Sequence, residues 1–376
     1  MTGPAALAGA LARLKTWLVQ DAFPLWSTAG ADRLGGGYHD LLDLKGRPVP
    51  GPKRARVQAR QAFVFAAAPA LGWDGPWEAA MRHGLDYLEQ RHRRPDGLYR
   101  ASVVLPVDRP DDSVDVYDQA FVLFALAAAH RAGEADAQAR AEALLGKLHP
   151  HPLAGFRELS GEALKANQNM HLFEAFMAWT QVGGGTVWRA LADRQAELAL
   201  TRLIGPETGA LSEFFGPGWT PPEDPADRLV EPGHLFEWAW LLLRWSVVAG
   251  RAQDLRAALR LIETAERSGV HHVRGVAVNG LDGALAPADL GARLWPQTER
   301  LKASLLAAQI TGDDGCWAAA ENAAATVLRY LETPTPGLWR DRMDASGAFV
   351  DEPSPASSLY HIVLAIQELE RVVGAA

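Results

Sequence analysis

The stretch of this sequence best suited to chemistry runs from Glu231 to Trp240 and reads Glu-Pro-Gly-His-Leu-Phe-Glu-Trp-Ala-Trp. A Glu-Pro-Gly turn ends the preceding segment, and His234 falls in the first turn of the helix that follows. Glu237 comes three residues later, so the two polar side chains share one face of that helix. The pattern fits either a site at the mouth of a buried helix or a core histidine held by a neighbouring glutamate.

Comparable polar residues stand at the starts of five other expected helices. They are Gln58, Arg60 and Gln61, then Tyr117 and Asp118, then Asn167, Asn169, His171 and Glu174, then Trp295, Gln297 and Glu299, and finally Tyr360 and His361. One such residue per helix is ordinary capping. Six sets that meet at one mouth predict a convergent polar pocket with aromatic walls, which is the usual form of a small-molecule site.

Histidines near carboxylates favour proton transfer at neutral pH, because imidazole titrates there. Removing a proton next to a carbonyl needs a base, an acid and a group that stabilises the enediolate. His234, His361 and Arg60 can supply these three roles. A glycoside hydrolase would instead use two opposed carboxylates. Asp118, Glu174, Glu237 and Glu299 are available for this, but the histidines compete with them for the centre of the site.

Metal chemistry is the other alternative, because two His-x-x-Glu pairs have a spacing found in metal sites of helical bundles. The sequence lacks a His-Glu-x-x-His motif and a cysteine cluster. We therefore expect no metal and no cofactor.

The elements that must position these residues are helical, since helical periodicity is found along the whole chain and strand signals are scarce. We expect about twelve helices, at 3–21, 55–71, 75–93, 114–132, 134–148, 166–182, 186–203, 232–249, 252–268, 294–311, 313–333 and 356–373.

A turn that begins with glycine precedes alternate helices, and most copies carry an aromatic residue. The turns start at residues 37, 97, 155, 209, 275 and 337, roughly 60 residues apart, which is the length of one helical hairpin repeat. Even-numbered helices are apolar nearly all round and odd-numbered ones are striped with charge. An inner ring of even helices within an outer ring of odd helices predicts an all-α (α/α)6 barrel. We expect it to form one domain over residues 1–376, with short β-hairpins at one end, as at Asp43–Gly46.

Composition excludes several classes of protein. The 376-residue chain has a net charge of −8 and no basic cluster, which argues against a nucleic-acid partner. Cys316 is the only cysteine, so no disulfide framework exists and a reducing cytoplasm is the simplest setting. The N-terminus does not resemble a signal peptide, and apolar runs are too short to span a membrane. We expect a cytoplasmic monomer or homodimer.

Taken together, the motifs resemble those of the N-acylglucosamine 2-epimerase superfamily over nearly the full length of the chain. The segments that carry the resemblance are Val57–Gln61, Tyr117–Phe121, Asn167–Glu174, Glu231–Trp238, Trp295–Glu299 and Leu359–His361. The resemblance implies an (α/α)6 barrel, a monosaccharide substrate and metal-free proton transfer between C1 and C2 of free sugars. Members include N-acylglucosamine and cellobiose 2-epimerases and isomerases acting on mannose, with a sulfoquinovose isomerase nearby.

The resemblance also implies roles for single residues. His234 and His361 match the two catalytic acid/base histidines, and Arg60 matches the arginine that holds the carbonyl end and the enediolate. His171 matches a histidine that opens or holds the sugar ring, and Glu237 matches a partner beside His234. The substrate is expected to contact a further set, which is Tyr117, Asp118, Asn169, Glu174, Trp295, Glu299 and Tyr360.

The last motif discriminates between branches of the superfamily. Its epimerases usually carry a tryptophan shortly before the final histidine, whereas residues 353–361 here read Pro-Ser-Pro-Ala-Ser-Ser-Leu-Tyr-His. This resembles the mannose-isomerase branch and predicts interconversion of D-mannose and D-fructose through a cis-enediolate. The alternatives are a 2-epimerase with the same two histidines, an isomerase of a phosphorylated sugar, and a sugar-binding or interaction protein.

Overall fold

The six repeat turns predicted from the sequence share one backbone conformation. The computed structural model describes residues 3–104, 109–150, 155–156, 164–224 and 228–374. The first glycine of each turn has a positive φ, from 66° at Gly37 to 90° at Gly97, which glycine adopts readily. In the first five turns a β-bridge then ties the turn back to the end of the preceding helix. These bridges are Ala31↔Tyr38, Arg93↔Tyr99, Pro150↔Phe156, Ile204↔Leu211 and Val270↔Ala277.

An amide side chain in the next helix holds several of these turns in place. Gln58 accepts a hydrogen bond from the backbone N–H of Tyr38 at 2.6 Å and donates one to its carbonyl oxygen at 2.9 Å. The pairs Gln119–Tyr99 and Gln297–Ala277 repeat this arrangement across the same 20-residue separation. The amides therefore satisfy buried backbone groups that would otherwise lack partners.

The described chain groups into two compact units. The first unit comprises Met1–Leu18, Ala196–Glu352 and His361–Ala376, and the second comprises Val19–Gln195 and Pro353–Tyr360. The expectation of a single domain over residues 1–376 stays a prediction.

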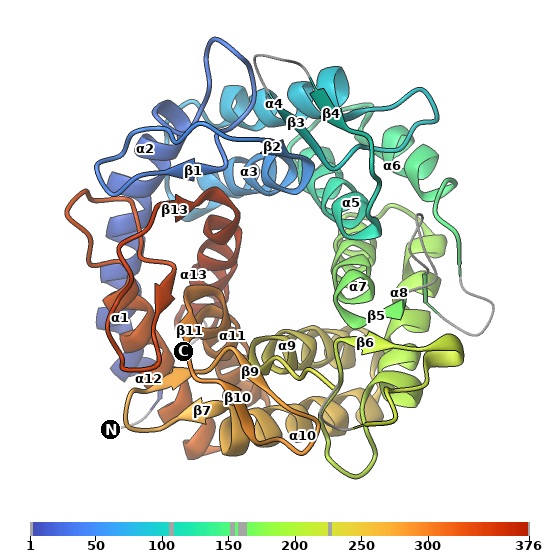
Figure 1. Ribbon diagram of the computed structural model, residues 1–376, viewed down its shortest axis with the longest axis vertical. Coiled ribbons are helices and arrows are strands. Elements are labelled where there is room, and N and C mark those ends of the chain that lie inside the picture. The colour runs from blue at the N-terminus through green and yellow to red at the C-terminus, as the bar shows by residue number, and fades with distance from the viewer. Residues whose placement is uncertain (1–2, 105–108, 151–154, 157–163, 225–227, 375–376) are drawn as a thin grey trace. The chain divides into compact units, whose positions relative to one another are not determined.

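In the second unit, three buried helices stand in a row. α3 (Ala55–Ala67) packs on α5 (Val116–Arg131), and α5 packs on α7 (Ala166–Gln181) (Figure 1). α5 buries all of its residues except Tyr117, His130 and Arg131, as its apolar sequence predicts. On the outer side, α4 (Trp77–Tyr87) packs on α3 and α6 (Ala137–Leu145) packs on α5, and α8 (Thr186–Leu198) follows α7 along the chain.

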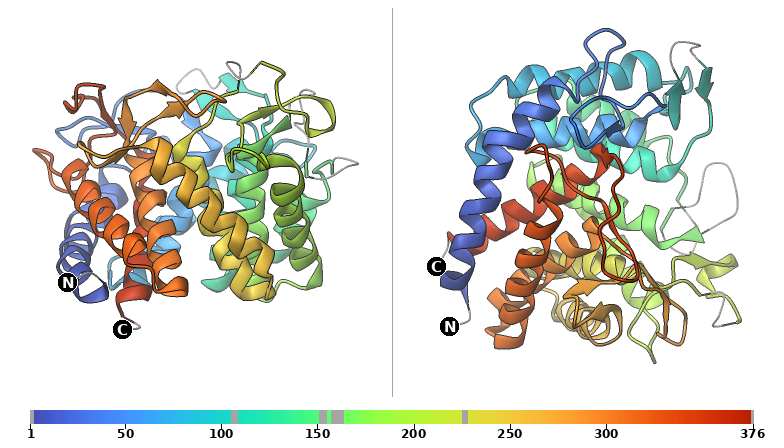
Figure 2. Two further views of the ribbon diagram at one scale, coloured as in Figure 1. Left: turned by 90° about the horizontal axis from the view of Figure 1, so that it is seen from below. Right: turned by 60° about the vertical axis from the view of Figure 1, so that its left-hand side comes forward.

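The first unit repeats this alternation. α9 (Pro232–Ala249) packs on α11 (Leu294–Thr311), α10 (Ala252–Gly269) covers α9, and α12 (Asp314–Tyr330) covers α11; these helices run from yellow to orange in Figure 2. α1 (Pro4–Thr16) packs on α12, and α13 (Leu359–Val373) begins in the second unit and continues into the first. α10 buries a single stripe of residues, which confirms its predicted outer position.

The strands are two or three residues long. Those of the second unit are β1 (Leu41–Leu42), β2 (Lys53–Arg54), β3 (Ser102–Val104), β4 (Arg109–Asp111), β5 (Leu164–Lys165) and β13 (Ser354–Pro355). Those of the first are β6 (Phe214–Phe215), β7 (Val270–His271), β8 (Val276–Ala277), β9 (Gly280–Leu281), β10 (Pro287–Asp289), β11 (Ala292–Arg293) and β12 (Arg342–Met343). β2, β5 and β11 each end where a buried helix begins, so a short strand sets the start of α3, α7 and α11.

The pairing of these strands is antiparallel. β2–β3–β4 form a three-stranded sheet, and β1–β13, β7–β8, β9–β10 and β11–β12 form pairs. The predicted hairpin at Asp43–Gly46 is closed by a bridge between Leu42 and Pro48. β1 and β13, by contrast, join distant parts of the sequence, which local turn signals do not predict.

The helix bounds differ from prediction at several ends. The expected helix 3–21 continues through a π-helical segment (Trp17–Ala22) into α2 (Phe23–Thr28). The wider π turn lets the helix pass Pro24, whose missing N–H would interrupt a regular α-helix. π-helical segments at Leu88–His92 and Ala199–Leu203 also follow α4 and α8. Among the described residues, no helix combines the length and apolar character that a membrane span requires.

Candidate active site

The first unit gathers two histidines and their charged partners around one tryptophan. This histidine cluster consists of Glu213, Glu231, His234, Glu237, Trp295, Glu299, Lys302 and His361. The Trp295 ring contacts both imidazoles, with its centroid 4.9 Å from that of His234 and 5.6 Å from that of His361. The first turns of α9, α11 and α13 thus bring both predicted acid/base residues to one place.

His234 is buried beside two carboxylates. Its Nδ1 lies 2.8 Å from Oε1 of Glu213 and 3.9 Å from Oε2 of Glu231. Burial acts to lower the pKa of His234, but Glu213 and then Glu231 outweigh it and raise that pKa to about 9. The imidazole is therefore protonated at neutral pH and can serve as an acid.

His361 has a different environment. Its Nδ1 is hydrogen-bonded to Oε1 of Glu299 at 2.7 Å, and Oε2 of Glu299 lies 2.6 Å from Nζ of Lys302. Glu299 and Lys302 are fully buried, and Nζ of Lys302 sits 3.8 Å from the centre of the Trp240 ring. The carboxylate that orients His361 is thus shared with an ammonium group.

The sequence paired Glu237 with His234, but the structure gives His234 a nearer partner. Glu213 makes the 2.8 Å contact, and Glu237 raises the pKa of His234 less than Glu213 or Glu231 does. A carboxylate oxygen of Glu237 instead lies within 4.8 Å of ligand atoms of Glu299 and His361. Helical spacing favoured Glu237, whereas Glu213 comes from outside the helix, directly after the fourth repeat turn.

The second unit places Arg60 among aromatic rings. We call Arg60, Tyr117, Phe121, His171, Glu174 and Tyr360 the arginine cluster. The Arg60 guanidinium lies 4.0 Å from the Phe121 ring centre and 5.0 Å from that of Tyr360, and it donates a 2.7 Å hydrogen bond to the Tyr117 hydroxyl. Among the described residues no carboxylate forms an ion pair with Arg60. A buried cation of this kind is suited to hold a negative group of a ligand.

His171 and Tyr360 share one carboxylate in this cluster. Nδ1 of His171 lies 3.3 Å from Oε2 of Glu174, and the Tyr360 hydroxyl donates a hydrogen bond to the same oxygen. The His171 ring also contacts the rings of Tyr117 and Phe121, at centroid distances of 5.0 and 4.5 Å. Four residues that the sequence predicted for the site, His171, Glu174, Tyr117 and Tyr360, therefore lie together with Arg60.

Two other predicted substrate contacts are engaged by the protein itself. The Asn169 amide accepts a hydrogen bond from the N–H of Phe156 and donates to the carbonyl oxygen of Lys165, so it holds a repeat turn. Asp118 is fully buried, with Oδ1 3.0 Å from Nε of Arg56. Burial raises the pKa of Asp118 to about 7, although Arg56 acts in the opposite direction.

Two groups in the first unit have donors close enough to hold a cation. They are Glu213 with Glu231 and His234, and Glu237 with Glu299 and His361. Each group already contains a carboxylate paired with a positive side chain, since Arg293 lies 3.0 Å from Glu231 and Lys302 lies 2.6 Å from Glu299. A cation in either group would therefore share a carboxylate with a positive side chain.

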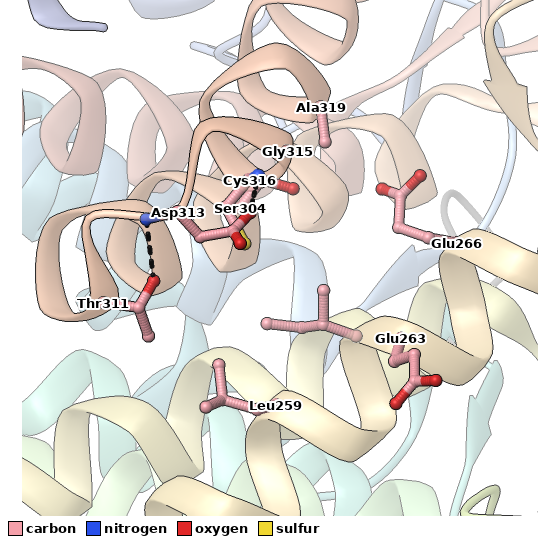
Figure 3. Close-up of a pocket in the computed structure, with 10 residues that line it drawn as sticks. Leu259, Glu263, Glu266, Ser304, Thr311, Asp313, Gly315, Cys316 and Ala319 are labelled. Atoms are coloured by element: carbon pink, nitrogen blue, oxygen red, sulfur yellow. Dashed lines mark hydrogen bonds between the residues drawn. The ribbon is translucent and has the colours of Figure 1, made fainter.

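A separate cavity of about 470 Å³ lies between α10, α11 and α12 (Figure 3). Leu259, Ser304 and Cys316 contribute to its lining. Its carboxylates are engaged, because Glu266 pairs with Arg300 and Asp313 caps α12. None of the predicted site residues lines this cavity, and it contains no acid/base pair.

Comparison with solved structures defines the class of the fold. A crystal structure of a D-mannose isomerase matches with a TM-score of 0.85, at 20% identity, covering 94% of this chain and 96% of the other. A cellobiose 2-epimerase from Bacillus thermoamylovorans B4167 matches with a TM-score of 0.86, at 19% identity, covering 96% and 99%. The chain has the all-α fold of these enzymes, an (α/α)6 barrel, as the sequence repeat predicted.

The sequence places the chain in a family. Residues 36–365 match the N-acylglucosamine 2-epimerase (GlcNAc 2-epimerase) family, and the chain belongs to it. The chain is also 45% identical over 372 residues to the "Mannose-6-phosphate isomerase" of Rhizobium meliloti (strain 1021), covering 95% of this chain and 96% of the relative. The protein is thus an enzyme of the sugar isomerase and epimerase kind.

Proposed function

We propose that the protein is an aldose–ketose isomerase that interconverts D-mannose and D-fructose. The observation that carries this proposal is the histidine cluster, in which two buried imidazoles contact one tryptophan ring and have separate carboxylate partners. Two titratable groups in unlike environments are the usual arrangement for an acid and a base that act in one reaction.

The proposed reaction moves one proton between adjacent carbons. His361 removes the proton at C2 of the open-chain aldose while O1 becomes an enediolate oxygen. Arg60 stabilises the negative charge of the cis-enediolate, and His234 donates a proton to O1. His361 then returns a proton to C1, and the O2 hydroxyl becomes the ketose carbonyl as it gives its proton back to His234. Atoms and electrons balance without an external oxidant or reductant.

The roles of the remaining residues follow from their contacts. Glu213 and Glu231 keep His234 charged, and Glu299 fixes the Nδ1 side of His361 so that Nε2 faces the sugar. Tyr117, His171, Glu174 and Tyr360 position Arg60 and bind sugar hydroxyls. Glu237 lies near Glu299 and His361 and is proposed to bind the substrate next to the reacting carbons.

A 6-phosphate of the same sugar is a second candidate, because the 45% identical relative is a "Mannose-6-phosphate isomerase". A phosphate dianion is best held by two or more basic groups. In the arginine cluster, Arg60 has no carboxylate partner among the described residues, but neighbouring Arg56 is already paired with Asp118. The balance of charge thus favours the free sugar.

Steady-state kinetics with both sugars decides between them. We expect kcat/KM for D-mannose to exceed that for D-mannose 6-phosphate by about tenfold or more. This ratio corresponds to a difference in free energy of about 1.4 kcal/mol. A preference of the same size for D-mannose 6-phosphate would contradict the free sugar as substrate and support the phosphorylated sugar instead. No ketose from either substrate would contradict the proposed function.

A further inference from the structure

We infer that Lys302 is a positioning residue for catalysis: it holds Glu299 in the ionised form and thereby keeps His361 free to accept a proton. This inference rests on the proposed function, because it explains how His361 serves as the base. Lys302 does not contact the imidazole itself and acts through Glu299.

The contacts of Lys302 account for this role. Its Nζ lies 2.6 Å from Oε2 of Glu299, and Oε1 of the same carboxylate lies 2.7 Å from Nδ1 of His361. Lys302 lies three residues after Glu299 on α11, so the helix fixes their separation. The cation also rests on the Trp240 ring of α9, 3.8 Å from its centre. A fully buried ammonium is tolerated only when paired in this way.

The two histidines differ in how their carboxylates are compensated. His234 faces Glu213, whose ion pair among the described residues is with His234 itself, and Glu231, whose charge is shared with Arg293; Glu237 adds a weaker interaction. In the first unit, His361 faces Glu299 and the nearby Glu237, but Lys302 offsets the charge of Glu299. A positive neighbour lowers the proton affinity of the Glu299–His361 pair as a whole. Lys302 therefore separates the two histidines into an acid and a base.

The test replaces Lys302 with methionine, which keeps an unbranched side chain one atom shorter and removes the charge. The active form needs ionised Glu299 and neutral His361, so losing the ammonium should make the pair hold a proton to higher pH. The acidic limb of the kcat/KM profile should then move up by about one pH unit or more. Lys302→Arg keeps a positive charge and should leave that limb where the wild type has it.

Lys53 provides a matched control outside the site. It is a buried lysine with Nζ 2.6 Å from Asp32 and 5.0 Å from the centre of the Tyr87 ring. Lys53→Met should reduce stability but leave the pH profile unchanged. If Lys302→Met and Lys53→Met both leave the acidic limb in place, Lys302 has only a structural role and the inference is wrong.

Two further measurements keep the test decisive. If Lys302→Met misfolds, Lys302→Gln takes its place, because it retains a hydrogen-bond donor beside Glu299 and also removes the charge. This variant must show the same upward displacement of the acidic limb. If it also misfolds, Lys302 has a structural role and the inference is wrong. The titration of His361 is also followed by NMR of histidine-labelled protein, with its signal identified by its loss in His361→Ala. That readout needs no substrate, so an unmoved midpoint contradicts the inference, whereas absence of turnover in the wild type contradicts the proposed function.

Discussion

Replacing Glu213 with glutamine tests whether a neighbouring carboxylate keeps His234 in its charged form. The change keeps the shape of the side chain and removes the negative charge 2.8 Å from Nδ1 of His234. That charge is the largest influence that raises the pKa of His234 to about 9, against the opposing influence of burial. Without it, burial and the more distant Glu231 are left to balance each other.

The expected size of the effect follows from this geometry. A charge partner in contact typically shifts a pKa by about 1–3 units, so the pKa of His234 should fall by about 2 units. One unit corresponds to about 1.4 kcal/mol, and the imidazolium therefore loses about 2.7 kcal/mol of stabilisation. Because His234 acts as the acid, the alkaline limb of the kcat/KM profile should move from about pH 9 to near pH 7.

The assay is the pH dependence of sugar isomerisation in the wild type, Glu213→Gln and Glu231→Gln. Glu231 is a graded control, since it lies 3.9 Å from Nδ1 of His234 and is already paired with Arg293. We expect a smaller displacement for Glu231→Gln than for Glu213→Gln. An alkaline limb that stays near pH 9 in Glu213→Gln would refute the assignment of His234 as the charged acid.

Three further predictions concern the two clusters and the repeat turns. His234→Ala and His361→Ala should each lower kcat by about 10²–10⁴-fold with an unchanged circular dichroism spectrum, because each removes an acid or base; near wild-type turnover would make that histidine structural. Arg60→Ala should lower kcat by about 10²–10³-fold and raise KM less, because the enediolate charge develops in the transition state; a change in KM alone would reduce Arg60 to substrate binding. Gln297→Ala should destabilise the fold by about 1–3 kcal/mol for each buried backbone group of Ala277 left unpaired. The partly exposed Gln138→Ala should change the free energy of unfolding in chemical denaturation by less than about 0.5 kcal/mol; equal effects would show that the hydrogen bonds of Gln297 to the repeat turn are unimportant.

Much of the fold could be predicted because the sequence repeats its turns. Each copy must place a glycine at positive φ and return the chain to a new helix, so local chemistry recurs at a visible period. The π-helical ends were not predictable, since a π turn differs from an α turn by a single residue in the bonding pattern. The pairing of β1 with β13 depends on chain segments more than 300 residues apart, for which no local signal exists.

The residue types of the two clusters stand out in the sequence more clearly than the contacts that they make. His234, His361 and Arg60 stand out because such groups are rarely placed at the start of an apolar helix without a reason. Glu213 and Lys302 did not stand out, because Glu213 lies in a loop and Lys302 looks like an ordinary surface lysine one turn beyond Glu299. Asn169 and Gln297 were assigned to the pocket, yet their amides bind backbone groups of the repeat turns. Distinguishing these uses requires the three-dimensional position of the partner.

The central claim is that the enzyme moves a proton between C2 and C1, and a proton NMR time course in D₂O tests it most directly. With D-mannose as the substrate, we predict early D-fructose that carries deuterium at C1, with little glucose, because the proton held by His361 exchanges with D₂O before it is returned. Should the phosphorylated sugar prove to be the substrate, the same label is expected at C1 of its ketose. Early glucose carrying deuterium at C2 would contradict the isomerase and establish the 2-epimerase alternative in its place.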